Sequence, residues 1–214
     1  MPVEEPLYPA NLRLQGVVCL VVGGGPVALG KVRGLLEAHA TVTVVAPDVV
    51  TELDELGASG DVAIERRRYE PGEAARYRLA VTATGDPAVD GAVYEDAEAA
   101  GVWVNAADDP AHCSFTVPAR IRRGPLLVTF ATGGQSPALA AWLRERFEEE
   151  LGPEYEKLLT LLAEARADLT ARGESTEHPG WKRALDSGML EMIREGHLAE
   201  AKERLQACLS SSSD

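Results

Sequence analysis

The chain has 214 residues, of which 45% are hydrophobic and 26% are charged, and its formal net charge at pH 7 is −13. This composition is typical of a soluble globular protein, and the length allows one large domain or a domain with an appendage. The acidic balance argues against nucleic acid as a partner, because binding of phosphates requires a basic face.

Neither a membrane span nor a secretory signal is expected. The apolar runs are shorter than the roughly 20 residues needed to span a bilayer, and residues 1–5 do not combine a basic region with an apolar one. The three cysteines, Cys19, Cys113 and Cys208, lack the spacing of a disulfide framework or a zinc site. We therefore expect a cytoplasmic protein.

Strand-like and helix-like segments alternate up to residue 105. The expected strands are 17–22, 41–46, 62–66, 79–84 and 102–105, and the expected helices are 27–38, 49–57 and 88–100. Apolar strands alternating with helices predict a parallel sheet covered on both faces. Further along, strands are expected at 115–119 and 126–131, joined by the arginine-rich segment 120–125, and helices from Pro137 onward.

The turn after the first strand has the pattern of a dinucleotide-binding corner. Gly23 permits a tight turn, Gly25 lets the backbone approach a pyrophosphate, and Ala28 stands where a third glycine usually lies. The pyrophosphate would bind free N–H groups at the helix start, flanked by Pro26 and Val27.

The end of the second strand bears on which cofactor is bound. It reads Val45-Ala46-Pro47-Asp48 and lacks an acid at the usual ribose-binding position, Ala46. Asp48 can take that role two residues later, or it can be the N-cap of the following helix. Because no arginine stands at this tip to receive a 2′-phosphate, we favour NAD over NADP.

A set of short segments carries a family resemblance. These segments are 8–12 (YPANL), 21–28 (VVGGGPVA), 31–33 (KVR), 82–87 (TATGDP), 104–110 (VNAADDP), 118–126 (PARIRRGPL) and 131–137 (ATGGQSP). In this order and spacing they resemble the precorrin-2 dehydrogenase / sirohydrochlorin ferrochelatase family of siroheme biosynthesis. The resemblance implies NAD-dependent oxidation of precorrin-2 to sirohydrochlorin, and in some members insertion of ferrous iron to give siroheme.

The resemblance also gives an expected architecture. The methyltransferase module fused in some members has no counterpart here, so the chain resembles the stand-alone form, a homodimer. We expect an α/β fold in three parts: a Rossmann-like NAD-binding domain (1–113), a small mixed dimerisation region (114–150) and a helical C-terminal domain (151–214).

Asp108 matches the family's key aspartate, which the resemblance implicates in dehydrogenation and, in chelating members, in handling the metal. It follows the strand 102–105, at the sheet edge where open α/β folds bind ligands. A carboxylate can accept a proton or guide a divalent metal. The alternative is that Asp108 or Asp109 caps a turn before Pro110. The resemblance also places Pro47 and Asp48 on the adenosine side of the cofactor, and Thr84 beside it.

Two further segments are candidates for holding the carboxylates of the tetrapyrrole. Arg120, Arg122 and Arg123 form the best cationic cluster, and the alternative is a solvated hairpin. The turn of Thr132, Gly133, Gly134 and Ser136 precedes a helix and can offer N–H groups to a carboxylate, or can be a flexible turn with a good cap.

Other interpretations stay open at this point. His112 is either a possible acid/base or metal ligand or an incidental loop residue. The chain could also be a non-catalytic NAD-binding regulatory module, although such a module has no need of the 105–110 segment or the arginines. A helical scaffold would explain only the C-terminal half.

Overall fold

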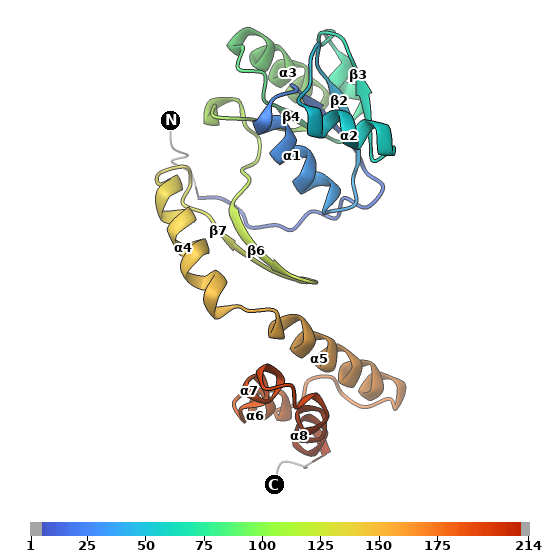
Figure 1. The fold of residues 1–214 in the computed structure, drawn as a ribbon, viewed down its shortest axis with the longest axis vertical. Coiled ribbons are helices and arrows are strands. Elements are labelled where there is room, and N and C mark those ends of the chain that lie inside the picture. The colour runs from blue at the N-terminus through green and yellow to red at the C-terminus, as the bar shows by residue number, and fades with distance from the viewer. Residues whose placement is uncertain (1–5, 211–214) are drawn as a thin grey trace. The chain divides into compact units, whose positions relative to one another are not determined.

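The computed structural model describes residues 6–210, which form two compact units (Figure 1). The first unit runs to Val117 and includes Gly133–Gln135, and the second holds Pro118–Thr132 and the chain from Ser136 onward. The three expected domains stay a prediction, and their outermost residues, 1–5 and 211–214, lie outside the described part.

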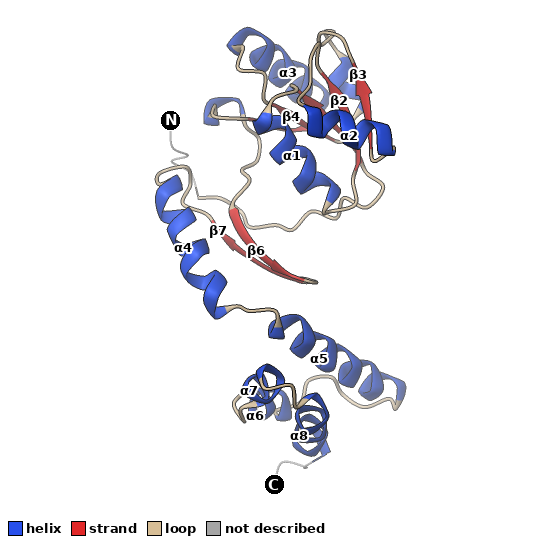
Figure 2. Ribbon diagram, in the orientation of Figure 1, coloured by secondary structure: helices blue, strands red, loops and turns tan. Residues whose placement is uncertain are grey.

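The first unit contains a five-stranded parallel sheet with the order β3-β2-β1-β4-β5. Its strands are β1 (Val18–Val22), β2 (Thr41–Val45), β3 (Val62–Glu65), β4 (Leu79–Thr82) and β5 (Trp103–Ala106). The helices are α1 (Pro26–Leu36), α2 (Thr51–Ser59) and α3 (Pro87–Ala100), with short 3-10 turns η1 (Glu73–Arg76) and η2 (Pro110–His112). This arrangement confirms the expected Rossmann-like fold class (Figure 2).

Alternate residues of the central strand β1 enter two separate cores, one on each face of the sheet. Cys19 and Val21 of β1 pack with helices α1 and α2 on one face. Leu20 and Val22 pack with α3 and η1 on the other. Because both faces are covered, the strands read as nearly continuous apolar runs.

Helix α2 differs from the expected helix 49–57. It begins at Thr51 and passes through Gly57 to Ser59, and Gly60 provides the left-handed C-cap with a φ of 84°. Gly57 is not a terminator because it lies against the side chain of Ile64, where its missing Cβ is what makes room. The left-handed conformation that ends a helix is adopted three residues later.

The second unit begins with a two-stranded antiparallel ribbon. Its strands are β6 (Ala119–Arg123) and β7 (Leu126–Phe130), and its helices are α4 (Pro137–Glu150), α5 (Glu154–Ala171), α6 (Gly180–Leu185), α7 (Met189–Arg194) and α8 (Leu198–Ser210). Leu158 and Leu161 of α5 pack with Met189, Ile193 and Leu205 to form a helical core.

The prediction of a strand at 115–119 is wrong. Residues 120–123 of the arginine-rich segment, which was expected to be a connection, belong to strand β6 (Ala119–Arg123). The residues before it are used by the first unit: Ser114 bonds the backbone of Val104, and the Phe115 carbonyl accepts from Asn105. Pro118 has no N–H to donate to a ladder, so pairing starts only at Ala119.

Candidate functional site

The glycine corner lies at the carboxyl end of β1, where neighbouring backbone segments leave no room for side chains. The Gly23 N–H donates to the Val45 carbonyl at 3.0 Å, and Gly23 has a φ of 124°. A Cβ on Gly23 would lie 2.4 Å from the Ala83 carbonyl oxygen, and one on Gly24 would lie 1.9 Å from that of Asp48. The corner is therefore wedged between the ends of β2 and β4.

Gly25 is different, because a Cβ there would meet nothing within 4 Å. Its carbonyl accepts the first helical bond from Leu29, at 3.0 Å, so the N–H groups of Val27 and Ala28 belong to the open first turn of α1. Pro26 occupies the first helical position and has no N–H to satisfy. An open backbone surface at a helix N-terminus fits the pyrophosphate of a dinucleotide.

The tip of β2 matches the sequence expectation in its residues. Ala46 is buried, and Pro47 and Asp48 are exposed. Asp48 is not the N-cap of α2, since that position belongs to Val50 and no side chain caps the helix. The N-cap alternative for Asp48 is therefore wrong, and its carboxylate is left at the surface beside the glycine corner, where its own carbonyl touches Gly24.

Thr84 lies at the carboxyl end of β4 in a small polar knot. Its hydroxyl donates to the Asp90 carboxylate at 2.7 Å and accepts from the Asp86 N–H at 3.0 Å. Asp90 is buried and also accepts from the Thr82 hydroxyl. The knot ties the end of β4 to the first turn of α3, so the position of Thr84 is fixed by its neighbours.

Asp108 lies just beyond β5 and has a φ of 61°, one of two non-glycine residues with positive φ among the described residues. It is exposed, whereas Asp109 provides the cap of η2 by accepting from the Ala111 N–H at 3.2 Å. The cap predicted for this turn therefore belongs to Asp109. Asp108 is therefore exposed at the carboxyl edge of the sheet, with a left-handed backbone conformation that occurs mainly in tight turns and at functional sites.

His112 lies beside Asp109, with its Nδ1 atom 2.6 Å from that carboxylate and its ring edge against Tyr94. The hydrogen bond from His112 holds the pKa of Asp109 below its usual value. The ring of His112 is therefore oriented by a carboxylate partner.

Lys31 is a residue whose place in the site the sequence reasoning undervalued. It reaches from α1 to β5, where its Nζ donates to Asn105 Oδ1 at 3.0 Å. Burial lowers the pKa of Lys31, although the nearby Cys113 and Asp108 favour its charged form. A lysine one helical turn after the glycine corner, next to an aspartate after β5, was the available signal. Lys31 thus joins helix α1 to Asn105 of strand β5, three residues before Asp108.

The three arginines Arg120, Arg122 and Arg123 lie on strand β6. Successive side chains of a strand point to opposite faces, so the three do not share one face. Ile121 is buried, and Arg123 shares its face. The Arg123 guanidinium donates to the Leu151 carbonyl at 2.7 Å and to the Glu148 carbonyl at 3.2 Å. Arg120 and Arg122 lie on the opposite face of the ribbon. Arg123 therefore fixes the ribbon to the end of α4.

The glycine turn before α4 has the expected cap. Ser136 accepts from the Leu139 N–H at 3.1 Å, and the Thr132 hydroxyl donates to the Ser136 carbonyl at 3.1 Å. Gly133 and Gly134 have φ values of 59° and 74°. Two successive left-handed residues need glycine, because a Cβ disfavours that conformation.

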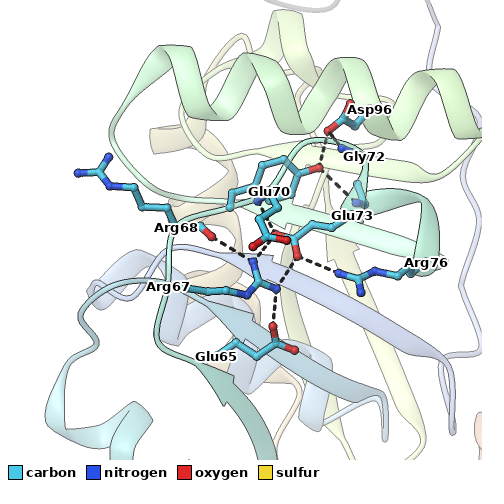
Figure 3. Close-up of polar contacts among 10 residues, drawn as sticks. Glu65, Arg67, Arg68, Glu70, Gly72, Glu73, Arg76 and Asp96 are labelled. Carbon is cyan, nitrogen blue, oxygen red and sulfur yellow. Dashed lines mark hydrogen bonds and ion pairs between the residues drawn. The ribbon is translucent and has the colours of Figure 1, made fainter.

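A polar network lies after β3, next to the tip of β2 (Figure 3). The Arg67 guanidinium binds both carboxylate oxygens of Glu73, at 3.1 and 2.6 Å, and also pairs with Glu65. Glu73 is only 4% exposed and accepts further bonds from the Glu70 N–H and from Arg76, both at 3.0 Å. The sequence reasoning did not identify this network.

Residues 6–210 contain no group of three or more His, Cys, Asp or Glu side chains arranged to hold a metal ion. The predicted insertion of ferrous iron therefore stays with the family resemblance, with Asp108 as the residue that it implicates. In the same part of the chain, no helix is both long enough and apolar enough to cross a membrane.

Comparison with known proteins gives a consistent picture. The family described as putative NAD(P)-binding matches residues 10–119. The chain is 37% identical over 209 residues to the siroheme synthase of Thioalkalivibrio sulfidiphilus, and 36% identical over 203 residues to that of Nitrosococcus oceani. These alignments cover 97% and 94% of this chain but only 43% of each relative, so the chain spans less than half the length of these curated relatives.

A solved structure is similar over nearly its whole length. The chain matches SirC, precorrin-2 dehydrogenase, with a TM-score of 0.71 and 28% sequence identity. The match covers 94% of this chain and 98% of that chain. The similarity therefore includes the helical C-terminal part as well as the parallel sheet.

Proposed function

This chain belongs to the family described as putative NAD(P)-binding, and from that premise we infer that it oxidises precorrin-2 to sirohydrochlorin with NAD as its cofactor. The observation that supports this most is the match to a precorrin-2 dehydrogenase over nearly the full length of both chains. The resemblance to siroheme synthases supports a role of this reaction in siroheme biosynthesis.

The residues of the glycine corner fit a dinucleotide. Gly23, Gly25, Pro26 and Val27 would hold the pyrophosphate, with Pro47 and Asp48 on the adenosine side and Thr84 on the other flank of the corner. When bound, NAD supplies an acceptor for the hydride that leaves the tetrapyrrole. Gly23 and Gly24 pack against neighbouring backbone, whereas the space beside Gly25 is open.

Asp108 is the residue that we assign to the chemistry. Oxidation of precorrin-2 removes a hydride and a proton, so a base must stand near the reacting carbon or nitrogen. Asp108 is exposed at the carboxyl edge of the sheet, and Lys31, anchored on Asn105, places a cationic group close to it.

Arg120 and Arg122 are the side chains that we assign to the carboxylates of the tetrapyrrole, because they share the ribbon face opposite buried Ile121. Arg123 is assigned to holding the ribbon, since its guanidinium is bonded to two backbone carbonyls. The turn of Thr132, Gly133, Gly134 and Ser136 offers N–H groups to a further carboxylate.

We also propose that the chain forms a homodimer through residues 114–150, which include the ribbon and helix α4. Leu139 and Trp142 of α4 are 47% and 53% exposed, which is high for large apolar side chains. Helix α4 packs against the ribbon β6–β7 of the same chain, where Phe130 stacks on Phe147, and this packing leaves Leu139 and Trp142 exposed. A second copy of the chain that covers these two side chains would remove their apolar surface from water.

The proposed function is tested by anaerobic mixing of the protein with NAD+ and precorrin-2. A dehydrogenase accumulates NADH and sirohydrochlorin in many equivalents per chain, whereas a non-catalytic NAD-binding module forms none. Binding of NADH without any turnover of precorrin-2 would favour the regulatory module instead.

A further inference from the structure

The preference for NAD over NADP needs a physical cause at the tip of β2. Rossmann proteins that bind NAD commonly place an acid there to bind the ribose, and those that bind NADP place an arginine nearby for the 2′-phosphate. This chain has Ala46 at the tip and no acid. Any arginine close to the tip therefore matters for the choice of cofactor.

Arg67 is such an arginine. Strand β3 pairs with β2 so that Glu65 lies opposite Val45, and the Ala46 N–H donates to the Glu65 carbonyl at 3.2 Å. Arg67 follows Glu65 by two residues, at the same carboxyl edge of the sheet. An unpaired guanidinium at this position would be an attractive site for a phosphate.

The guanidinium of Arg67 is already bound to carboxylates (Figure 3). Glu73 takes it in a two-pronged pair, Glu65 forms an ion pair with it, and the Arg68 carbonyl accepts a bond at 3.0 Å. Burial works against ionisation of Glu73, but hydrogen bonds from Arg67 and the Glu70 N–H hold its pKa below the usual value. The pair is thus a salt bridge between fully charged groups.

The segment that carries Glu73 is itself fixed to α3. The Tyr69 hydroxyl donates to Asp96 at 2.8 Å, the Gly72 N–H donates to the same carboxylate at 2.6 Å, and the Ala74 N–H donates to the Tyr69 oxygen at 3.2 Å. Because these bonds hold η1 in place, Glu73 keeps Arg67 in one position. If Arg67 left this position, the buried carboxylate of Glu73 would lose its main partner.

We propose that Glu73, assisted by Glu65, is a specificity-determining residue that withholds Arg67 from the 2′-phosphate of NADP and so makes the site selective for NAD. The inference rests on the proposed function, since it assumes that the glycine corner binds a nicotinamide dinucleotide. It assigns the selectivity to a salt bridge beside the tip of β2 rather than to an acid on the tip itself.

The test is to measure the dissociation constants of NADH and NADPH by fluorescence titration of the full chain, for the unmutated protein and for Glu73→Gln. The amide removes the charge that holds Arg67. We expect NADPH to bind about 10-fold more tightly to Glu73→Gln, with the NADH constant within about two-fold, because a freed arginine–phosphate contact is worth about that factor.

Two matched variants identify the side chain responsible. Adding Arg67→Met to Glu73→Gln is expected to abolish the gain in NADPH affinity, whereas adding Arg68→Met is expected to leave it, since Arg68 points away from the network (Figure 3). Glu70→Gln is the control for a charge lost from the same segment, because only the Glu70 N–H joins the network. A gain that depends on Arg68, or one that Glu70→Gln reproduces, would overturn the proposal.

A folded Glu73→Gln protein that binds NADH normally but gains no affinity for NADPH would also overturn the proposal, while leaving the proposed function intact. If Glu73→Gln does not fold, Glu65→Gln provides the same test, because it releases one partner of Arg67 and leaves the buried pair whole. A gain in NADPH affinity of about three-fold that depends on Arg67 is then expected, and an unchanged ratio contradicts the inference. A chain that binds neither nucleotide would overturn the proposed function and this inference with it.

Discussion

Asp108 is the side chain to which we assign the chemistry of the reaction. Its carboxylate is exposed at the carboxyl edge of the sheet, and its backbone has a φ of 61°. Asparagine tolerates this left-handed conformation better than most residues do, so Asp108→Asn removes the charge with little strain. We expect the kcat for NADH formation to fall by about 100-fold or more, which is typical for the loss of a general base.

The neighbouring carboxylate is the control for Asp108. Asp109 caps η2 and holds His112, and it is not assigned to the reaction. Asp109→Asn keeps an oxygen that can cap η2, so we expect less than about a 10-fold change in kcat. Normal turnover by Asp108→Asn, with the NADH dissociation constant unchanged, would contradict the role of Asp108.

Alanine substitutions at the adjacent Gly24 and Gly25 are predicted to have different effects on stability and on NADH binding. A Cβ on Gly24 would collide with the Asp48 carbonyl, so Gly24→Ala should lower the free energy of unfolding by about 1–3 kcal/mol as well as weaken NADH binding. A Cβ on Gly25 meets open space, and alanine is a poorer N-cap than glycine, so Gly25→Ala should lower the free energy of unfolding by less than about 1 kcal/mol while it weakens NADH binding. Urea denaturation and NADH titration separate the two effects.

Gly30 serves as the internal reference, because it lies within α1 with nothing near its missing Cβ. Gly30→Ala should stabilise the protein by up to about 1 kcal/mol through helix propensity and leave NADH binding unchanged. If Gly25→Ala behaves like Gly30→Ala in both measurements, the pyrophosphate does not lie against this corner.

At the scale of elements, helix α4 carries the prediction of a dimer. Trp142 is 53% exposed, and the Arg146 guanidinium lies over its ring, 5.6 Å from the ring centre. If a second chain covers it, Trp142→Glu should raise the dimer dissociation constant by about 30-fold or more, as expected for loss of a central aromatic residue. Light scattering over a range of concentrations measures this change.

Leu198 on α8 is also exposed, at 43%, and lies outside the proposed interface, so Leu198→Glu should leave the dimer intact. The proposal of a dimer fails if the unmutated chain is monomeric at every concentration. It fails equally if Trp142→Glu and Leu198→Glu associate as the unmutated chain does.

The elements also show how far the sequence alone can lead. All five parallel strands were predicted to within a few residues, because most residues of each strand are apolar, and this pattern can be recognised without knowledge of tertiary contacts. Strand β6 was misplaced because Arg120, Arg122 and Arg123 look like a loop. They form a strand only because β7 pairs with it.

In the candidate site too, some features could be predicted from the sequence and others could not. Gly23 and Gly25 could be found because a turn demands their residue type. The packing of Gly24 on Asp48 could not, since 24 residues separate the two contacting backbones. The bond from Lys31 to Asn105 spans 74 residues, and the pair of Arg67 and Glu73 depends on a loop conformation that no periodicity reports.

Across the whole molecule, the buried Glu73 links stability to pH. Its pKa lies below the unfolded value of 4.5, so the carboxylate stabilises the folded state above that pH. The contribution is lost as the pH falls through the lower folded pKa. Near neutral pH we expect Glu73→Gln to be less stable than the unmutated chain by about 1–3 kcal/mol, the value of hydrogen bonds to a charged group.

The difference between these two proteins should shrink as the pH falls below about 4.5, because protonation of Glu73 then removes the charge that the variant already lacks. Urea unfolding at several pH values measures it. A difference that stays constant, or grows, on acidification would mean that Glu73 is not ionised in the folded protein.

The account as a whole depends on transfer of a hydride from precorrin-2 to a dinucleotide bound by this chain. The most direct measurement is an anaerobic single turnover with the protein in excess over precorrin-2, following NADH and sirohydrochlorin by absorbance in the same cell. We predict that both appear at one rate and in equal amounts, and that Asp108→Asn slows both together. Sirohydrochlorin formed without NADH, or neither product formed by a chain that binds NAD+, would contradict it.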